Sequence, residues 1–204
     1  YKVSRKSQQA FLGPSILVVQ VLVPQGDKVA ESTIIDGIAG SEAIDSSGEI
    51  LDVAGADISD LVEGRATLSW EHKDEKDPAH TAMDHVGKIV YAKKIFKESD
   101  CEDDRQRMYW KKVELPYIYF KTRLYDGAGH PAAIALAAIF RDAEQHNEPV
   151  LARYSVEGAT LKKEGNRLLK TVVRRVTATV KPCNRSAVSG IVSDAGPVFL
   201  DESS

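Results

Sequence analysis

The sequence is poor in cysteine and has no excess of charge of either sign. Only two of its 204 residues are cysteines, Cys101 and Cys183, and they stand far apart without a CxxC pair. This spacing argues against a disulfide-stapled scaffold and fits a reducing compartment. The formal net charge of −3 predicts no broad basic surface for nucleic acid or for an anionic membrane.

Long apolar runs are also absent. The longest, residues 16–23 and 132–140, fall well short of the roughly 20 residues that a membrane-spanning helix needs. We therefore expect a protein that binds neither nucleic acid nor membrane. Its length fits one domain over residues 15–197, preceded by a polar arm over residues 1–14 and followed by a tail over residues 198–204.

What the sequence does contain is a series of short β-prone segments separated by turn residues. These segments are rich in β-branched and aromatic residues or alternate with a period of two. We expect strands over residues 15–23, 31–39, 49–53, 65–70, 84–96, 117–125, 150–163 and 167–180. The pattern predicts an α+β fold in which a mostly antiparallel sheet closes into a barrel beside one long helix and short flanking helices.

The long helix is expected over residues 130–144, where Pro131 suits the first helical position. Its expected buried side consists of Ile134, Leu136, Ile139, Phe140 and Ala143. A short helix over residues 57–62 would be capped by Asp57. We expect loops at residues 98–104 and 182–197, whereas residues 108–113 fit either a helix or a strand.

One serine and one histidine suggest chemistry. Ser155 lies in the alternating run 150–158, on the strand face opposite Tyr154, and His72 follows the apolar strand 65–70. If these two strands meet, the imidazole can take the serine proton and make the hydroxyl a nucleophile. Partial burial of His72 would keep its ring neutral, as a base requires. The same pattern also fits an ordinary sheet serine and a packed histidine.

A metal site is the first alternative. His72, His80 and His85 fall within fourteen positions and could bind zinc as in a three-ligand hydrolytic site. Their spacing matches neither an HExxH motif nor a zinc finger, and a solvated charged loop explains the same residues.

Arg174 and Arg175 are adjacent on an expected strand and therefore point to opposite faces. Either could donate hydrogen bonds to an oxyanion. The usual arrangement of such a pair is one exposed arginine and one ion-paired arginine.

The order of the segments resembles that of the prohead (capsid maturation) proteases of tailed phages, which share the assemblin fold of herpesviruses. Leu68-Ser-Trp-Glu-His72 resembles the strand that ends at the catalytic histidine, and Tyr154-Ser-Val-Glu-Gly158 resembles the nucleophile strand. The resemblance covers about residues 32–190, and its motifs are short. The other segments that carry it are Asp36 to Ile50, His85-Val-Gly-Lys-Ile89, the strand, turn and helix that precede Ser155, Gly165-Asn166, Val176 to Val180 and Lys181-Pro-Cys-Asn184.

This resemblance implies that Ser155 is the nucleophile and His72 the general base of a serine endopeptidase. The family's third catalytic member, an acid or a second histidine, often lies on the strand after the hairpin. Here Thr177 occupies the matching position, where it could orient the imidazole by a hydrogen bond, and Asp84 or His85 could take that role instead.

The resemblance further implies a protease that cleaves scaffold and capsid proteins, and finally itself, inside the procapsid in the host cytoplasm. Leu200-Asp-Glu202 is similar to the Leu-x-Glu cleavage sites of some members. This interpretation needs no cofactor and no metal, and it is compatible with a homo-oligomer. A non-catalytic virion or tube-like protein on a related barrel is the other alternative.

Overall fold

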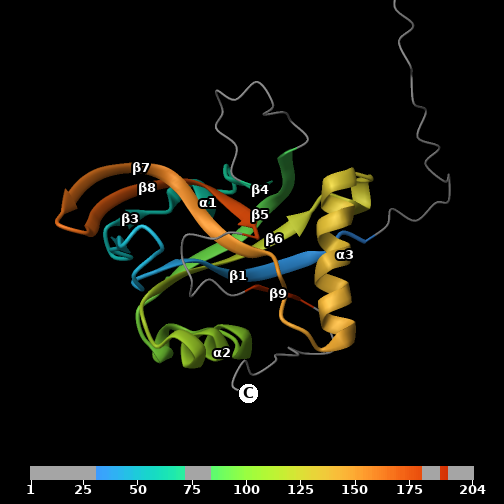
Figure 1. Cartoon of the computed structure of the whole chain (residues 1–204), viewed down its shortest axis with the longest axis horizontal. Coiled ribbons are helices and arrows are strands. Elements are labelled where there is room, and N and C mark those ends of the chain that lie inside the picture. Colours follow the sequence, from blue (N-terminus) through green and yellow to red (C-terminus); the bar gives the residue numbers. More distant parts are fainter. Residues whose placement is uncertain (1–30, 72–83, 181–188, 193–204) are drawn as a thin grey trace, which may run out of the picture.

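Nine strands pair into one open sheet in the computed structural model of the protein, which describes residues 31–71, 84–180 and 189–192 (Figure 1). The strands are β1 (Ile34–Ser41), β2 (Ile50–Leu51), β3 (Ala56–Asp57), β4 (Thr67–Trp70), β5 (His85–Ile95), β6 (Tyr117–Leu124), β7 (Arg153–Glu164), β8 (Arg167–Thr179) and β9 (Ser189–Ile191). The helices are α1 (Ser59–Val62), α2 (Asp104–Val113) and α3 (Pro131–His146), with 3-10 turns η2 (Glu98–Asp100) and η3 (Asp126–Ala128). The α+β class expected from the sequence is confirmed.

Strand β8 organises one half of the sheet. The strand order is β2-β8-β4-β5-β6-β1-β9, and β3 and β7 also pair with β8. β8 runs antiparallel to β7 but parallel to β2, β3 and β4, whereas the remaining pairs are antiparallel. The described strands do not form the expected closed barrel, because β2 and β9 at the ends of the order do not pair with each other.

Strand β6 lies between two hydrophobic cores. Ile118 and Phe120 are fully buried with α3 on one side of the sheet. Tyr117 and Tyr119 are fully buried on the other side, with Tyr109 of α2. The two helices therefore cover different parts of the sheet, as Figure 1 shows. None of the helices in the described ranges is long and apolar enough to cross a bilayer.

Helix α3 begins as the sequence predicts, with Pro131 in its first turn and the His130 side chain accepting a hydrogen bond from the Ala133 N–H at 3.3 Å. The buried stripe differs from the expected one at Ile134, which is 47% exposed, and at Ile139, which is only partly buried. Ala133, Leu136, Ala137, Phe140 and Ala143 are the buried residues. They follow the spacing of three and four residues that keeps side chains on one helical face, and Ile134 lies off that face.

Three shorter predictions need correction. The acidic residues 98–104 do not form a simple loop, because Asp103 caps α2 by accepting from the Gln106 N–H at 2.8 Å. Asp57 belongs to β3 and precedes the first residue of α1 by two positions, although it accepts from the Ser59 N–H at 3.0 Å. β9 lies inside the segment expected to be a loop. The strand expected over residues 15–23 lies outside the described residues.

A buried ion pair fastens α2 to the sheet. Asp36 of β1 is fully buried and accepts hydrogen bonds from Arg105 Nε at 2.6 Å, from Tyr109 Oη at 2.9 Å and from Tyr119 Oη at 2.7 Å. Arg105 Nη2 also donates to this carboxylate. Burial, and then the negative charge of Asp36, raise the pKa of both tyrosines well above the usual value.

Candidate active site around Ser155

The direction of the Ser155 side chain follows from the packing of its neighbour. Tyr154 is fully buried, and its ring packs edge to face against Phe120 with centroids 4.6 Å apart. Successive side chains of a strand point to opposite faces, so Ser155 points away from this aromatic core. The alternation predicted for residues 150–158 is therefore confirmed where β7 is described.

Ser155 belongs to a row of hydroxyl side chains across three strands. It lies opposite Thr177 of β8, and Thr177 in turn lies beside Ser69 of β4. All three residues are buried, with exposed fractions of 5%, 0% and 3%. β4 and β7 were expected to meet, and they do lie in one sheet, but as the two neighbours of β8. Two strand spacings, about 10 Å, separate their backbones.

A carboxylate stands next to this row. Glu157 lies two residues after Ser155 on the same face and accepts a hydrogen bond from the Thr177 hydroxyl. It also forms an ion pair with Arg175, whose Nε donates to it at 2.8 Å. Arg174 is exposed, so the two arginines follow the usual arrangement of one exposed and one ion-paired side chain. The sequence pattern alone assigns Glu157 no role, although its spacing of two residues from Ser155 is the signal that places both side chains on one strand face.

The end of β4 approaches the same region. The Glu71 N–H donates to the carbonyl of Ala178 at 2.8 Å, and the Glu71 carboxylate accepts from the Thr179 hydroxyl at 2.9 Å. Glu71 is the last residue described before the gap, so His72 and His80 lie outside the described residues. The contact between Ser155 and His72 therefore stays a prediction.

Asp84 and His85, the alternatives for the third catalytic position, lie at the start of β5. His85 pairs with Ser69, and its Nδ1 lies 2.9 Å from the Thr67 hydroxyl. Asp84 is 7% exposed. His85 is three strands, or about 14 Å, from Ser155, too far for a direct hydrogen bond. Within the described ranges no three His, Cys, Asp or Glu side chains gather in a metal-binding group.

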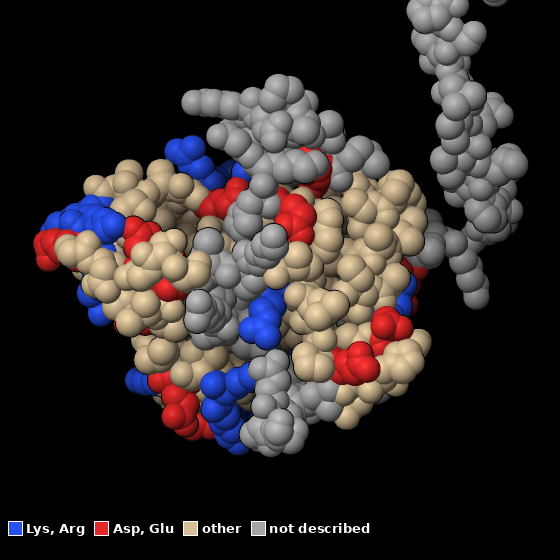
Figure 2. Space-filling model, in the orientation of Figure 1, with Lys and Arg blue, Asp and Glu red and all other residues tan. Residues whose placement is uncertain are grey.

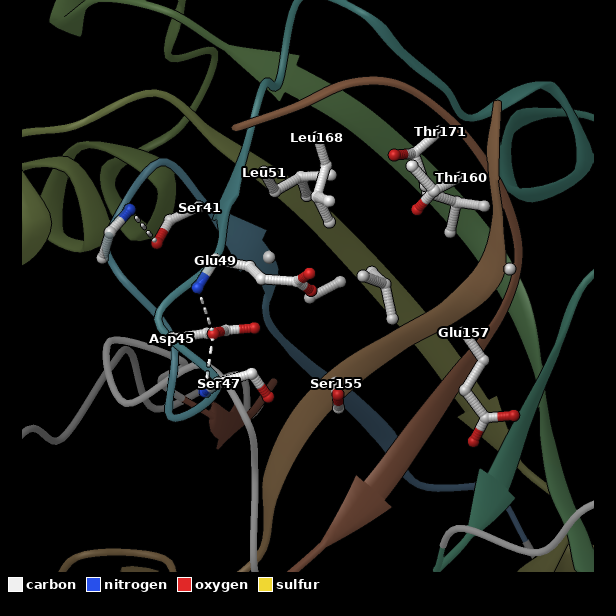
Figure 3. A pocket seen from close by; sticks show the side chains of 16 residues that line it. Ser41, Asp45, Ser47, Glu49, Leu51, Ser155, Glu157, Thr160, Leu168 and Thr171 are labelled. Atoms are coloured by element: carbon white, nitrogen blue, oxygen red, sulfur yellow. Dashed lines mark hydrogen bonds between the residues drawn. The ribbon is translucent and has the colours of Figure 1, made fainter. Parts of the chain in front are cut away.

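A cavity of about 340 Å³ opens beside Ser155 (Figure 3). It lies between the β7–β8 hairpin and the chain that leaves β1. Figure 3 shows Ser155 at one end of it and Thr160 and Thr171 at the other. The residues that line it are Ala39, Gly40, Ser41, Ala43, Asp45, Ser47, Glu49, Leu51, Ser155, Val156, Glu157, Gly158, Thr160, Leu168, Thr171 and Val173.

The hydroxyl of Ser155 makes no hydrogen bond with any residue in the described ranges. Its position in the cavity lining therefore leaves it able to contact a bound molecule.

On the face of the molecule seen in Figure 2, basic and acidic side chains lie interspersed.

Comparisons of this chain with protein-family models, with curated proteins and with solved structures found no match.

Proposed function

We propose that the protein is a serine endopeptidase of the prohead protease type, with Ser155 as nucleophile and His72 as general base. One observation carries the proposal: the Ser155 hydroxyl has no partner among the described residues and lines a cavity. The strand that leads to His72 is held by the same β8 that holds the Ser155 strand. The proposal includes an assemblin-like barrel, to which the strand predicted over residues 15–23 would contribute.

In the proposed reaction, Ser155 Oγ attacks the carbonyl carbon of the scissile peptide bond while His72 takes the hydroxyl proton. The C–N bond breaks as the imidazolium returns this proton to the leaving amine, and an acyl-enzyme remains. Water, deprotonated by the same imidazole, then hydrolyses the ester. The oxyanion would be stabilised by backbone N–H groups beside Ser155 or by the side chain of Arg174 or Arg175. The guanidinium of Arg175 already binds Glu157.

Thr177 suits the third catalytic position, next to the serine and the histidine, because of a hydrogen bond that the sequence did not reveal. Its hydroxyl proton is donated to Glu157, so its oxygen lone pairs can accept a hydrogen bond from an imidazole N–H. The negative charge of Glu157 would strengthen that acceptor. A neutral hydroxyl could in this way fix the ring orientation that an acid fixes in other serine proteases.

The substrates we propose are scaffold and capsid-protein segments and the chain itself, inside a phage procapsid in the host cytoplasm. The first test does not depend on their sequences. A fluorophosphonate probe phosphonylates only activated serines, so incubation with the full chain should label Ser155, as located by peptide mass mapping. Ser155→Ala should abolish the label, and His72→Ala should slow it by at least a hundredfold.

Ser99→Ala is the matched control, because Ser99 is an exposed serine of η2 and should have no effect on labelling. A label on another residue, or equal labelling of the Ser155→Ala protein, would refute the proposed function. A probe-reactive wild-type chain should also cleave itself on prolonged incubation, which intact-mass measurement detects.

A further inference from the structure

The cavity beside Ser155 is elongated along β7. Its lining includes the four consecutive residues 155–158 and then Thr160. A cavity on one face of a strand touches alternate residues, so contact with consecutive residues means that it runs along the strand edge. From Ser155 to Thr160 the strand rises by about 16 Å, the length of about five residues of an extended peptide. The shape fits an extended chain segment better than a single side chain.

Apolar side chains form much of the wall. Val156 comes from β7, Leu168 from β8 and Leu51 from β2, and Ala39 and Gly40 of β1 also line the cavity. Contact with such a wall removes a bound side chain from water. Removal from water favours the binding of an apolar side chain and disfavours the binding of a charged side chain that has no partner in the cavity.

The carboxylates of the lining are already occupied. Asp45 accepts from the N–H groups of Ser47 and Glu49, each at 2.8 Å. Glu49 pairs with Lys163, and Glu157 pairs with Arg175. None of the described lining residues is a lysine or an arginine. An acidic side chain in the cavity would therefore find carboxylates nearby and no cation directly in the wall.

One buried hydroxyl of the lining lacks a partner. Thr171 is 7% exposed, and its Oγ1 has no hydrogen-bond partner among the residues that the structure describes. It lies across from Thr160 on the neighbouring strand, and Figure 3 shows both hydroxyls at the end of the cavity away from Ser155. It is one of five buried side-chain polar atoms without a partner in the described ranges, and the only one of the five whose residue lines the cavity. A polar atom of a bound segment would satisfy it.

We propose that this cavity is the specificity groove of the protease and binds an extended substrate segment that is uncharged and largely apolar. Val156, Leu51 and Leu168 contact its apolar side chains, and Thr171 hydrogen-bonds a peptide carbonyl or a side-chain amide. The groove binds the residues that follow the cleaved bond, and acidic residues are rejected within about five positions there. The acidic residues of the segment Leu200-Asp-Glu202 would precede the cleaved bond and lie outside the groove. This inference rests on the proposed function of Ser155.

The test uses a proteome-derived peptide library cleaved by the full chain. Wild-type protein should cleave peptides with Leu, Ile, Val or Met at one or more of these positions and with Asp and Glu depleted there. Thr160→Trp places a large ring in the groove from an exposed position. It should lower kcat/KM for the best library peptide at least tenfold, while the rate of fluorophosphonate labelling of Ser155 changes by less than twofold.

Lys162→Trp is the matched control, because Lys162 is exposed on the same strand and does not line the cavity. It should leave both measurements unchanged. Thr171→Val, which keeps the side-chain shape and removes the hydroxyl, should raise KM about two- to tenfold with kcat unchanged.

Cleavage by Thr160→Trp with wild-type kcat/KM and preferences, or enrichment of acidic residues at the groove positions, would overturn the inference while leaving the proposed function intact. If wild-type Ser155 failed to react with the probe at all, the proposed function and this inference would fail together.

Discussion

Replacing Arg105 with methionine should destabilise the protein far more than the same replacement of Arg107, two positions along α2. Both arginines form ion pairs with aspartates, but the surroundings differ. The Arg105–Asp36 pair has side chains 11% and 0% exposed, whereas the Arg107–Asp104 pair has side chains 43% and 87% exposed. The two variants therefore remove the same type of residue from the same helix and from the same type of ion pair. They differ mainly in how deeply the ion pair is buried.

The expected magnitudes follow from that difference. Arg105→Met leaves the Asp36 carboxylate buried, with the hydroxyls of Tyr109 and Tyr119 as its remaining partners among the described residues. Removing one member of a buried pair costs about 3–5 kcal/mol. This is a large part of the roughly 5–15 kcal/mol by which a domain is stable. Arg107→Met should cost less than about 1 kcal/mol, because solvent screens the exposed pair.

Equilibrium urea unfolding of the full chain, followed by circular dichroism, measures both values. A second variant separates charge burial from lost packing. Asp36→Asn combined with Arg105→Met leaves a neutral amide whose oxygen still accepts from a tyrosine hydroxyl, so it should recover part of the lost stability. The reasoning fails if Arg105→Met costs no more than Arg107→Met, or if the double variant is less stable than Arg105→Met alone.

Two further predictions concern the cores. Burial, and then the charge of Asp36, raise the pKa of Tyr109, Tyr119 and Tyr154. Above about pH 10, where an unfolded tyrosine loses its proton, the folded state therefore binds more protons. The free energy of unfolding should fall by about 1.4 kcal/mol per pH unit for each such tyrosine. Urea unfolding between pH 8 and 11 measures this fall, and a constant free energy across that range would contradict it. Leu136→Ala should cost about 2–5 kcal/mol because Leu136 is buried in α3. Ile134→Ala should cost less than about 1 kcal/mol, and equal losses would mean that the buried face of α3 is assigned wrongly.

The features that the sequence predicted correctly depend on residues close together in the chain. Pro131 located the start of α3, and the alternation around Tyr154 located the face of Ser155. Such patterns report the period of a segment and the residues that end it. The error at Ile134 has the same origin, because an apolar residue beside the buried stripe cannot be told from one within it by its type alone.

Partners distant in the sequence could not be predicted. Nothing in residues 65–70 indicates that β4 runs parallel to β8, and this pairing is what aligns Ser69 with Thr177 and Ser155. The hydrogen bond from Thr177 to Glu157 depends on the same register. Local patterns in the sequence therefore indicate single side chains of the candidate site. Which of these side chains are neighbours depends on how the strands pair.

Strand β8 determines the register of the candidate site, because Ser155 pairs with it on one side and Ser69 on the other. Loss of one residue from β8 between Thr171 and Thr177 would turn the following side chains to the opposite face, and the aromatic core would then receive polar groups. Residues gained at the turn of Gly165 and Asn166 would not shift the pairs near Ser155. They would displace Asn166 from its hydrogen bonds with the Gly48 carbonyl and the Ile50 N–H. A change of chain length at the tip of this hairpin should therefore disturb the candidate site less than the same change within β8.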